Sequence, residues 1–218
     1  YETWVTKYPD RLIGFSGVDP IDRAGRLNWK ALRSFEKSIK EYGFKGLKLL
    51  PTYGHYAPND RRVYLFYQKA LEFDVPVLLH MGATPLPNAP IRYSRPELLE
   101  DVAMDFPDLP LIMAHLAKPW TEELYTLMIK YGNIYTDISA LCKLGLRMLT
   151  WYLVMAKEYG VLNRVMWGTD KTCMPHKYYV DWCKTGLNQT AEKHGWPTFT
   201  KQEIDNLMGE TAAKLLKL

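Results

Sequence analysis

Three short apolar segments of the sequence end in residues that commonly bind metals or transfer protons. They are residues 75–82 with His80, residues 110–115 with His115 and residues 164–170 with Asp170. Each segment is short for a helix and rich in aliphatic residues, so each is predicted to be a strand buried on both faces. Parallel strands place their carboxyl ends at one edge of a sheet. The sequence therefore predicts that His80, His115 and Asp170 share a site.

Two imidazoles and a carboxylate in equivalent positions favour a functional site over a structural role. A single histidine at a strand end is more often a core residue with satisfied nitrogens. A buried aspartate, however, needs a cation or strong hydrogen-bond donors nearby. Imidazole and carboxylate ligands fit a divalent metal, zinc first, with manganese or iron as less specific alternatives.

Composition excludes several other classes of protein. The chain of 218 residues carries a net charge of +4 without a dense cluster of lysine and arginine, which argues against nucleic-acid binding. No apolar run approaches the roughly 18 residues of a membrane helix. The 3 cysteines are odd in number and show no CxxC spacing, which indicates a reducing compartment, the cytoplasm, and no disulfide framework. The length favours a single domain over residues 1–218.

Short apolar segments alternate with amphipathic ones along the chain. Strands are predicted at residues 12–18, 46–51, 75–82, 110–115, 133–138 and 164–170. Helices are predicted at residues 29–42, 62–73, 96–106, 121–131, 146–159, 178–194 and 201–216. Asn28 is expected to cap the first helix, which Gly43 ends, and Thr200 with Glu203 forms a capping box before the last. The proline-rich stretch 84–96 is predicted to be a long loop next to His80.

This alternation predicts a parallel sheet wrapped by helices, for which two architectures compete. A doubly wound sheet usually places its chemistry at a glycine-rich phosphate loop, and the sequence has neither GxGxxG nor a Walker motif. A (β/α) barrel takes catalytic groups from the ends of several strands. We therefore expect a distorted, TIM-like (β/α)8 barrel whose first two strands would lie before Tyr1.

Further motifs follow one another in order along nearly the whole chain. They are YPDR at 8–11, GFKGLK at 43–48, PVLLH at 76–80, FPDL at 106–109, AHL at 114–116, NIYTD at 133–137 and WGTD at 167–170. In this order they resemble the amidohydrolase-related family of the amidohydrolase superfamily, whose members include aminocarboxymuconate semialdehyde decarboxylase. The resemblance is specific for the family and not for a substrate.

The resemblance implies a distorted TIM barrel with a divalent metal at the carboxyl mouth. By position, it implies that His80 is a metal ligand and that His115 acts on the substrate or its water. Asp170 would be a metal ligand that also holds or accepts a proton. The family's His-x-His pair of the first strand has no counterpart here, since no two of the 5 histidines are two residues apart. This departure predicts a chain that is incomplete at its N-terminus or has lost part of its metal site.

The family implies a small carboxylated or cyclic substrate and leaves two reactions open. In a hydrolase, water attacks a carbonyl, Asp170 takes its proton and His115 stabilises the oxyanion. In a non-oxidative decarboxylase, His115 or Asp170 transfers a proton to carbon. The alternative to both is a truncated or degenerate barrel without activity that serves as a binding or structural fragment. Its open sheet edges would favour pairing into a homodimer.

Other polar residues near the predicted strand ends are weaker candidates. Arg92 in the proline-rich loop, Trp120 and His55 are predicted to contact the substrate, Arg92 because a guanidinium suits an acidic ligand. Lys48 is predicted to lie mid-strand and to pair with a carboxylate, rather than to be carboxylated as a lysine is in other branches of the superfamily. Asp137 is expected either to join the site or to hold a loop by hydrogen bonds.

Overall fold

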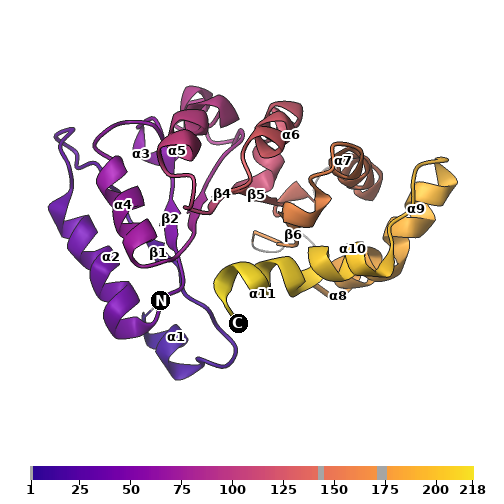
Figure 1. Cartoon of the computed structure of the whole chain (residues 1–218), viewed down its shortest axis with the longest axis horizontal. Helices are drawn as coiled ribbons and strands as arrows, with labels where there is room; N and C mark the ends of the chain where they lie inside the picture. The colour runs from indigo at the N-terminus through magenta and orange to yellow at the C-terminus, as the bar shows by residue number, and fades with distance from the viewer. Residues whose placement is uncertain (1, 142–144, 171–175) are drawn as a thin grey trace.

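Six short strands form one parallel sheet in which each strand pairs with the preceding one (Figure 1). The computed structural model of the protein describes residues 2–141, 145–170 and 176–218. The strands are β1 (Ser16–Gly17), β2 (Leu47–Leu49), β3 (Val77–Leu79), β4 (Leu111–Met113), β5 (Ile134–Asp137) and β6 (Val165–Met166). This sequential order is that of a (β/α) barrel, whereas a doubly wound sheet reverses its order at a switch point. The predicted TIM-barrel-like architecture is confirmed.

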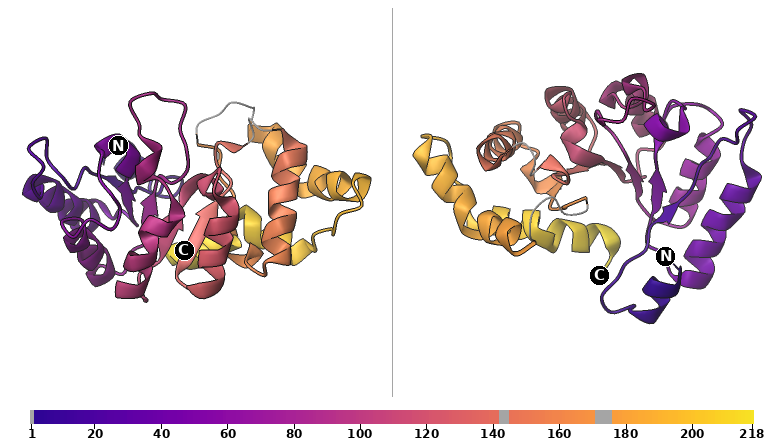
Figure 2. Two further views of the ribbon diagram at one scale, coloured as in Figure 1. Left: turned by 90° about the horizontal axis from the view of Figure 1, so that it is seen from above. Right: turned by 180° about the vertical axis from the view of Figure 1, so that it is seen from behind.

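Helices connect successive strands, and most of them follow one another along the outer face of the curved sheet (Figures 1 and 2). Before β6 they are α1 (Glu2–Lys7), α2 (Trp29–Tyr42), α3 (Pro51–Gly54), α4 (Tyr64–Glu72), α5 (Glu100–Asp105), α6 (Thr121–Lys130) and α7 (Leu146–Glu158). After β6 come α8 (His176–Asp181), α9 (Leu187–Lys193), α10 (Lys201–Asp205) and α11 (Thr211–Leu216). Among the described residues β1 and β6 do not pair, so the barrel stays open. None of the described helices is long and apolar enough to cross a bilayer.

The two faces of the sheet differ in their residues. Leu47 and Leu49 of β2 are fully buried against the helices, as are Val77 and Leu79 of β3. The residue between each pair points to the concave face, and there Lys48 lies in register with Leu78. The strands therefore anchor the outer core with alternate residues and leave the others to line the inside of the open barrel.

The helix signals in the sequence are matched by the structure. Asn28 caps α2 by accepting a hydrogen bond from the Ala31 N–H, and Gly43 ends the helix with a left-handed φ of 67°. The Thr200 and Glu203 capping box is present at the start of α10. Local side-chain chemistry thus sets these helix ends before any tertiary contact is considered.

Other boundaries depend on long-range contacts. The predicted strand over residues 164–170 pairs only at β6, and the predicted helix over 178–194 is divided by a π-turn at Trp182–Gly186. The predicted helix over 201–216 has a similar π-turn at Asn206–Glu210, where the Trp167 N–H donates to the Leu207 carbonyl. The π-turn thus lies where this helix contacts the strand end after β6. The short helices α1 and α3 were not predicted; proline at the first position of α3 favours its start.

Candidate active site

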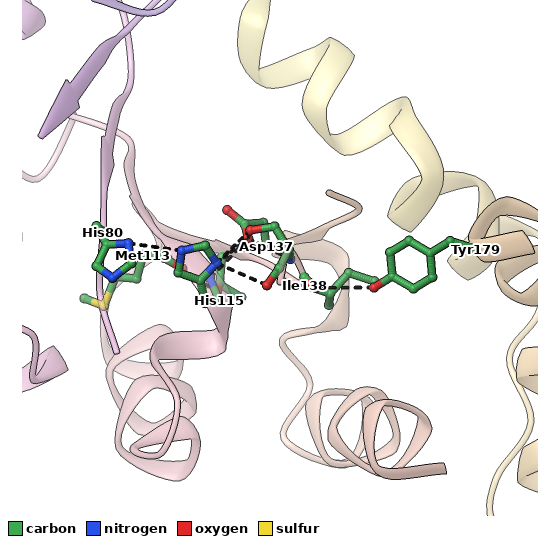
Figure 3. A network of polar contacts seen from close by, with 8 residues as sticks. His80, Met113, His115, Asp137, Ile138 and Tyr179 are labelled. Carbon is green, nitrogen blue, oxygen red and sulfur yellow. Dashed lines mark hydrogen bonds and ion pairs between the residues drawn. The ribbon is translucent and has the colours of Figure 1, made fainter. Parts of the chain in front are cut away.

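The structure brings His80 and His115 together at the carboxyl ends of adjacent strands. His80 follows β3 directly, and His115 lies two residues beyond β4. The His115 Nε2 lies 3.2 Å from the His80 Nδ1, and the two ring centroids are 4.8 Å apart (Figure 3). The prediction that these strand ends share one edge is confirmed for the two histidines.

Asp137 and Ser139, from the next strand end, hold His115 in place. The His115 backbone N–H donates to Asp137 Oδ1 over 3.1 Å. The His115 Nδ1 lies 2.8 Å from the Ser139 Oγ and 3.1 Å from the Ser139 carbonyl oxygen. The Ser139 hydroxyl and backbone N–H both donate to the same Asp137 Oδ1. Asp137 thus holds the loop by hydrogen bonds, which was one of the two alternatives predicted for it. It also supports His115. Sequence reasoning missed Ser139, whose only signal is a hydroxyl two residues after a strand.

The backbone turns abruptly where His115 leaves the sheet. His115, Leu116 and Ala117 have φ values of 63°, 50° and 46°, a left-handed run without glycine. Residues other than glycine are uncommon there, and such strain persists where surrounding contacts fix it. Gly82, with φ of 87°, packs against this turn, and a Cβ at that position would lie 2.6 Å from the Lys118 carbonyl oxygen. Only glycine fits this close approach beside His80.

His80 is a half-buried base whose Nε2 is buried and unused. Among the described residues, its Nε2 is buried and has no hydrogen-bond partner. Burial, and then the charges of His115 and Lys48, lower the pKa of His80 to about 3. The ring is therefore neutral at neutral pH and offers a nitrogen to a ligand.

This burial predicts a pH dependence of stability. Because the His80 pKa is about 3 in the folded chain, against roughly 6.5 in an unfolded one, the unfolded state binds more protons between these values. Stability should therefore fall as the pH drops below about 6.5, by roughly 2–3 kcal/mol at pH about 4.5. Urea unfolding of the wild type and of His80→Asn measures this. The variant should lack that part of the loss, and equal losses in both proteins would refute the assignment.

Lys48 and Asp170 lie near this pair without joining it directly. Burial lowers the pKa of Lys48, and the nearby charges of Asp137 and Asp170 oppose that shift. Lys48 forms no ion pair with a carboxylate in the described ranges, so the predicted pairing is an electrostatic attraction at longer range. Asp170 is exposed, with φ of 49°, and within the described chain no hydrogen bond or ion pair joins it to either histidine. Its role as a ligand stays a prediction.

The three predicted substrate contacts have their recorded partners in or beside the proline-rich loop. The His55 Nε2 lies 2.7 Å from the Asn88 carbonyl oxygen, so this ring holds the loop. The Arg92 guanidinium lies 4.7 Å above the Tyr93 ring, and Trp120 lies under Arg95 at 5.8 Å. None of the three contacts His80 or His115, and their role in substrate binding stays a prediction.

Tyr53 is the aromatic residue that reaches His80. Its ring packs edge-on against the imidazole, with centroids 5.0 Å apart, and its hydroxyl donates to the Thr84 Oγ1 over 2.9 Å. Sequence reasoning did not select it. Tyr53 therefore joins the segment after β2 to the start of the proline-rich loop, directly over the site.

A cavity of about 1240 Å³ lies beside β1 and β2 and is also lined by residues of α1 and α2. Lys48, Tyr53 and Leu78 line its inner end, while Leu12 and Ile13 line its outer, exposed part. The cavity has room for a small organic ligand. Lys48 gives its inner end a positive charge.

The described residues fit a metal only in part. The unpartnered His80 Nε2 is a ready ligand, and a neutral imidazole suits zinc, manganese or iron. However, no group of three or more histidine, cysteine, aspartate or glutamate residues within the described ranges is placed to hold an ion. A complete site therefore needs donors other than a cluster of these residues.

The order of the strands and the position of the site at their carboxyl ends define a TIM-barrel-like protein. The family model described as amidohydrolase matches residues 1–218. The chain belongs to the amidohydrolase family, and the predicted resemblance is confirmed. It is therefore an enzyme of the amidohydrolase superfamily. A search of curated proteins finds no match.

Solved structures support the fold. An uncharacterised TIM-barrel protein from Bordetella bronchiseptica is 21% identical, with a TM-score of 0.74 over 99% of this chain and 70% of its own. A dihydroxybenzoic acid decarboxylase from Polaromonas sp., with bound manganese and the inhibitor 2-nitroresorcinol, is 18% identical, with a TM-score of 0.71. The match covers 100% of this chain and 72% of the decarboxylase chain. A probable 2-pyrone-4,6-dicarboxylic acid hydrolase from Acinetobacter baumannii with bound citric acid is 18% identical, with a TM-score of 0.64. The match covers 100% of this chain and 77% of the hydrolase chain.

Proposed function

We propose that the protein is a metal-dependent enzyme that acts on a small carboxylated aromatic or cyclic substrate, by non-oxidative decarboxylation or by hydrolysis. The observation that carries this proposal is the buried, unpartnered Nε2 of His80 at the carboxyl ends of the strands. Barrels of this class place their active sites at that end. The family match and the decarboxylase and hydrolase among similar structures support it.

The proposed metal ligands are His80, through Nε2, and Asp170. Zinc is the first candidate, with manganese or iron as alternatives, and manganese is the ion bound in the Polaromonas structure. When bound, such an ion supplies a Lewis acid that polarises an oxygen of the substrate. Asp170 is also proposed as the group that accepts a proton.

Lys48 is proposed to bind the substrate carboxylate. Lys48 lines the cavity, and its ammonium forms no ion pair with a described carboxylate. A carboxylated ligand would supply the missing anion in a site of low dielectric, where the attraction is strong. His55, Arg92 and Trp120 remain proposed contacts for the outer part of the ligand.

His115 is proposed to act mainly through His80. Its Nε2 faces the His80 Nδ1 and its Nδ1 faces Ser139, so both ring nitrogens are already engaged. Direct proton transfer to a substrate, as the sequence predicts for His115, would require the contact with His80 to open. The structure therefore favours a positioning role for this imidazole.

The substitution Lys48→Met should separate carboxylate binding from stability. We expect 2,6-dihydroxybenzoate to bind at least about 10-fold more weakly, because a charge-assisted contact is lost. Resorcinol, which lacks the carboxylate, should bind as before. The melting temperature should not fall, since methionine replaces a half-buried cation that forms no ion pair with a described carboxylate. Calorimetric titration measures both ligands, with exposed Lys45→Met as the matched control. Equal weakening of both ligands would contradict the role.

The two reactions are distinguished by their products. Release of carbon dioxide from 2,6-dihydroxybenzoate would identify a decarboxylase, and ring opening of 2-pyrone-4,6-dicarboxylate would identify a hydrolase. Each reaction is followed in the presence of zinc or manganese and again after chelation. Metal-dependent turnover of one substrate supports the proposal, and no turnover of a wider panel of carboxylated rings and lactones would overturn it.

A second candidate is a barrel without catalysis that serves as a binding or structural module. The absence of a three-ligand group among the described residues favours it. Exposed Trp4, Leu12 and Ile13 around the open side of the barrel suit coverage by a second copy, so we propose a homodimer in this case. Light scattering coupled to size exclusion measures the assembly. The proposed location in either case is the cytoplasm, on the cysteine content.

A further inference from the structure

We propose that Asp137, Ser139 and His115 form a hydrogen-bond relay that fixes His80 as its Nδ1–H tautomer and leaves a free lone pair on its Nε2 (Figure 3). His115, Ser139 and Asp137 are then positioning residues, which act on a ligand through His80. The inference rests on the proposed function only for the use of that lone pair. The tautomer itself is set by groups of this chain.

The direction of the relay is fixed first at Asp137. Its Oδ1 accepts the backbone N–H groups of His115, over 3.1 Å, and of Ser139, over 2.9 Å. A backbone N–H can only donate, so this oxygen is an acceptor. The Ser139 hydroxyl contacts the same oxygen and must therefore donate its single hydrogen to it.

The proton on His115 follows from the state of Ser139. With its hydrogen used, the Ser139 Oγ has only lone pairs to offer the His115 Nδ1 at 2.8 Å. The Ser139 carbonyl oxygen, at 3.1 Å from the same nitrogen, is also only an acceptor. Both contacts are favourable only if Nδ1 carries hydrogen. The relay we propose takes His115 in its neutral form, in which this is the only N–H, so the His115 Nε2 carries a lone pair.

That lone pair determines the tautomer of His80. The His115 Nε2 lies 3.2 Å from the His80 Nδ1, and these two nitrogens attract each other only if the His80 Nδ1 is protonated. With its one ring hydrogen on Nδ1, His80 leaves Nε2 without hydrogen, and this buried nitrogen has no partner within the described chain. A ligating histidine has this state, with one nitrogen oriented by an acceptor and the other free to bind.

Nuclear magnetic resonance measures the tautomer directly. The chain is labelled with ¹⁵N-histidine and kept in chelator at neutral pH, so that ring nitrogens report hydrogen bonds alone. Spectra of His80→Asn assign the His80 signals. We expect a protonated Nδ1 and an unprotonated Nε2 for both His80 and His115. A His80 ring protonated at Nε2, or a doubly protonated His115, would overturn the relay whatever the enzyme assays show.

Substitutions test whether the relay, rather than His80 alone, sets this state. His115→Phe keeps an aromatic ring but removes the acceptor, so His80 should shift towards the Nε2–H tautomer that free histidine favours. Ser139→Ala, which keeps the carbonyl acceptor, should shift the His115 signals and leave His80 largely Nδ1–H. The signals of exposed His194 serve as the control in each spectrum. If His80 keeps its tautomer in folded His115→Phe, the relay is refuted; should that variant not fold, the wild-type spectrum still decides.

Discussion

The substitution His80→Asn should abolish metal retention and lower turnover by about 10³-fold or more, because it removes a buried nitrogen that has no partner among the described residues and offers a free lone pair. Asparagine is smaller than histidine and polar, so we expect the fold to be kept. Elemental analysis of the purified protein and a turnover assay with added zinc measure the two effects.

The matched control for this prediction is His194→Asn. The His194 side chain is exposed and stacks on Trp196, with ring centroids 4.7 Å apart, far along the chain from the strand ends. It should keep the metal content and turnover of the wild type. If His80→Asn also keeps both, the metal does not bind at this edge of the sheet, and the proposed function fails with it.

The substitution Asp137→Ala should have the largest effect on stability. Its carboxylate accepts two backbone N–H groups and one hydroxyl at the ends of β4 and β5, and its side chain is only 14% exposed. Alanine leaves these donors without a partner, at a cost of about 2–4 kcal/mol. In a chain of this size the melting temperature should fall by roughly 5–15 °C. Thermal and urea unfolding measure both quantities.

Two further variants separate this effect from a loss of charge alone. Asp137→Asn keeps an oxygen acceptor in nearly the same place, so it should lose less than half as much stability. Asp108→Ala removes an exposed carboxylate and should change stability by less than about 0.5 kcal/mol. An Asp137→Ala protein as stable as the wild type would show that the left-handed turn at His115 is held by other contacts.

The parts of the fold that could be predicted are those with local causes. The alternation of apolar runs and amphipathic segments led to six parallel strands in sequential order, and Asn28 and Gly43 marked both ends of α2. A histidine placed at the end of a buried strand is also a local feature, so the meeting of His80 and His115 could be predicted. Each of these depends on a few neighbouring residues.

The rest of the site depends on contacts between segments that the sequence does not connect. Ser139 reaches His115 only because the chain turns back after β5, and nothing near Ser139 in the sequence indicates this. The left-handed run from His115 to Ala117 contains no glycine and has no local signal. The contact of the His55 ring with the Asn88 carbonyl oxygen likewise joins two loops that are distant in the sequence, and no local signal indicates it.

The most direct test is anomalous diffraction from crystals of the chain grown with zinc, which shows whether the His80 Nε2 binds the metal. The account predicts one strong anomalous peak at about 2.0–2.1 Å from the His80 Nε2, with the His80 Nδ1 still facing the His115 Nε2. A zinc ion bound elsewhere, or a His80 Nε2 that contacts no ion at a saturating zinc concentration, would contradict it.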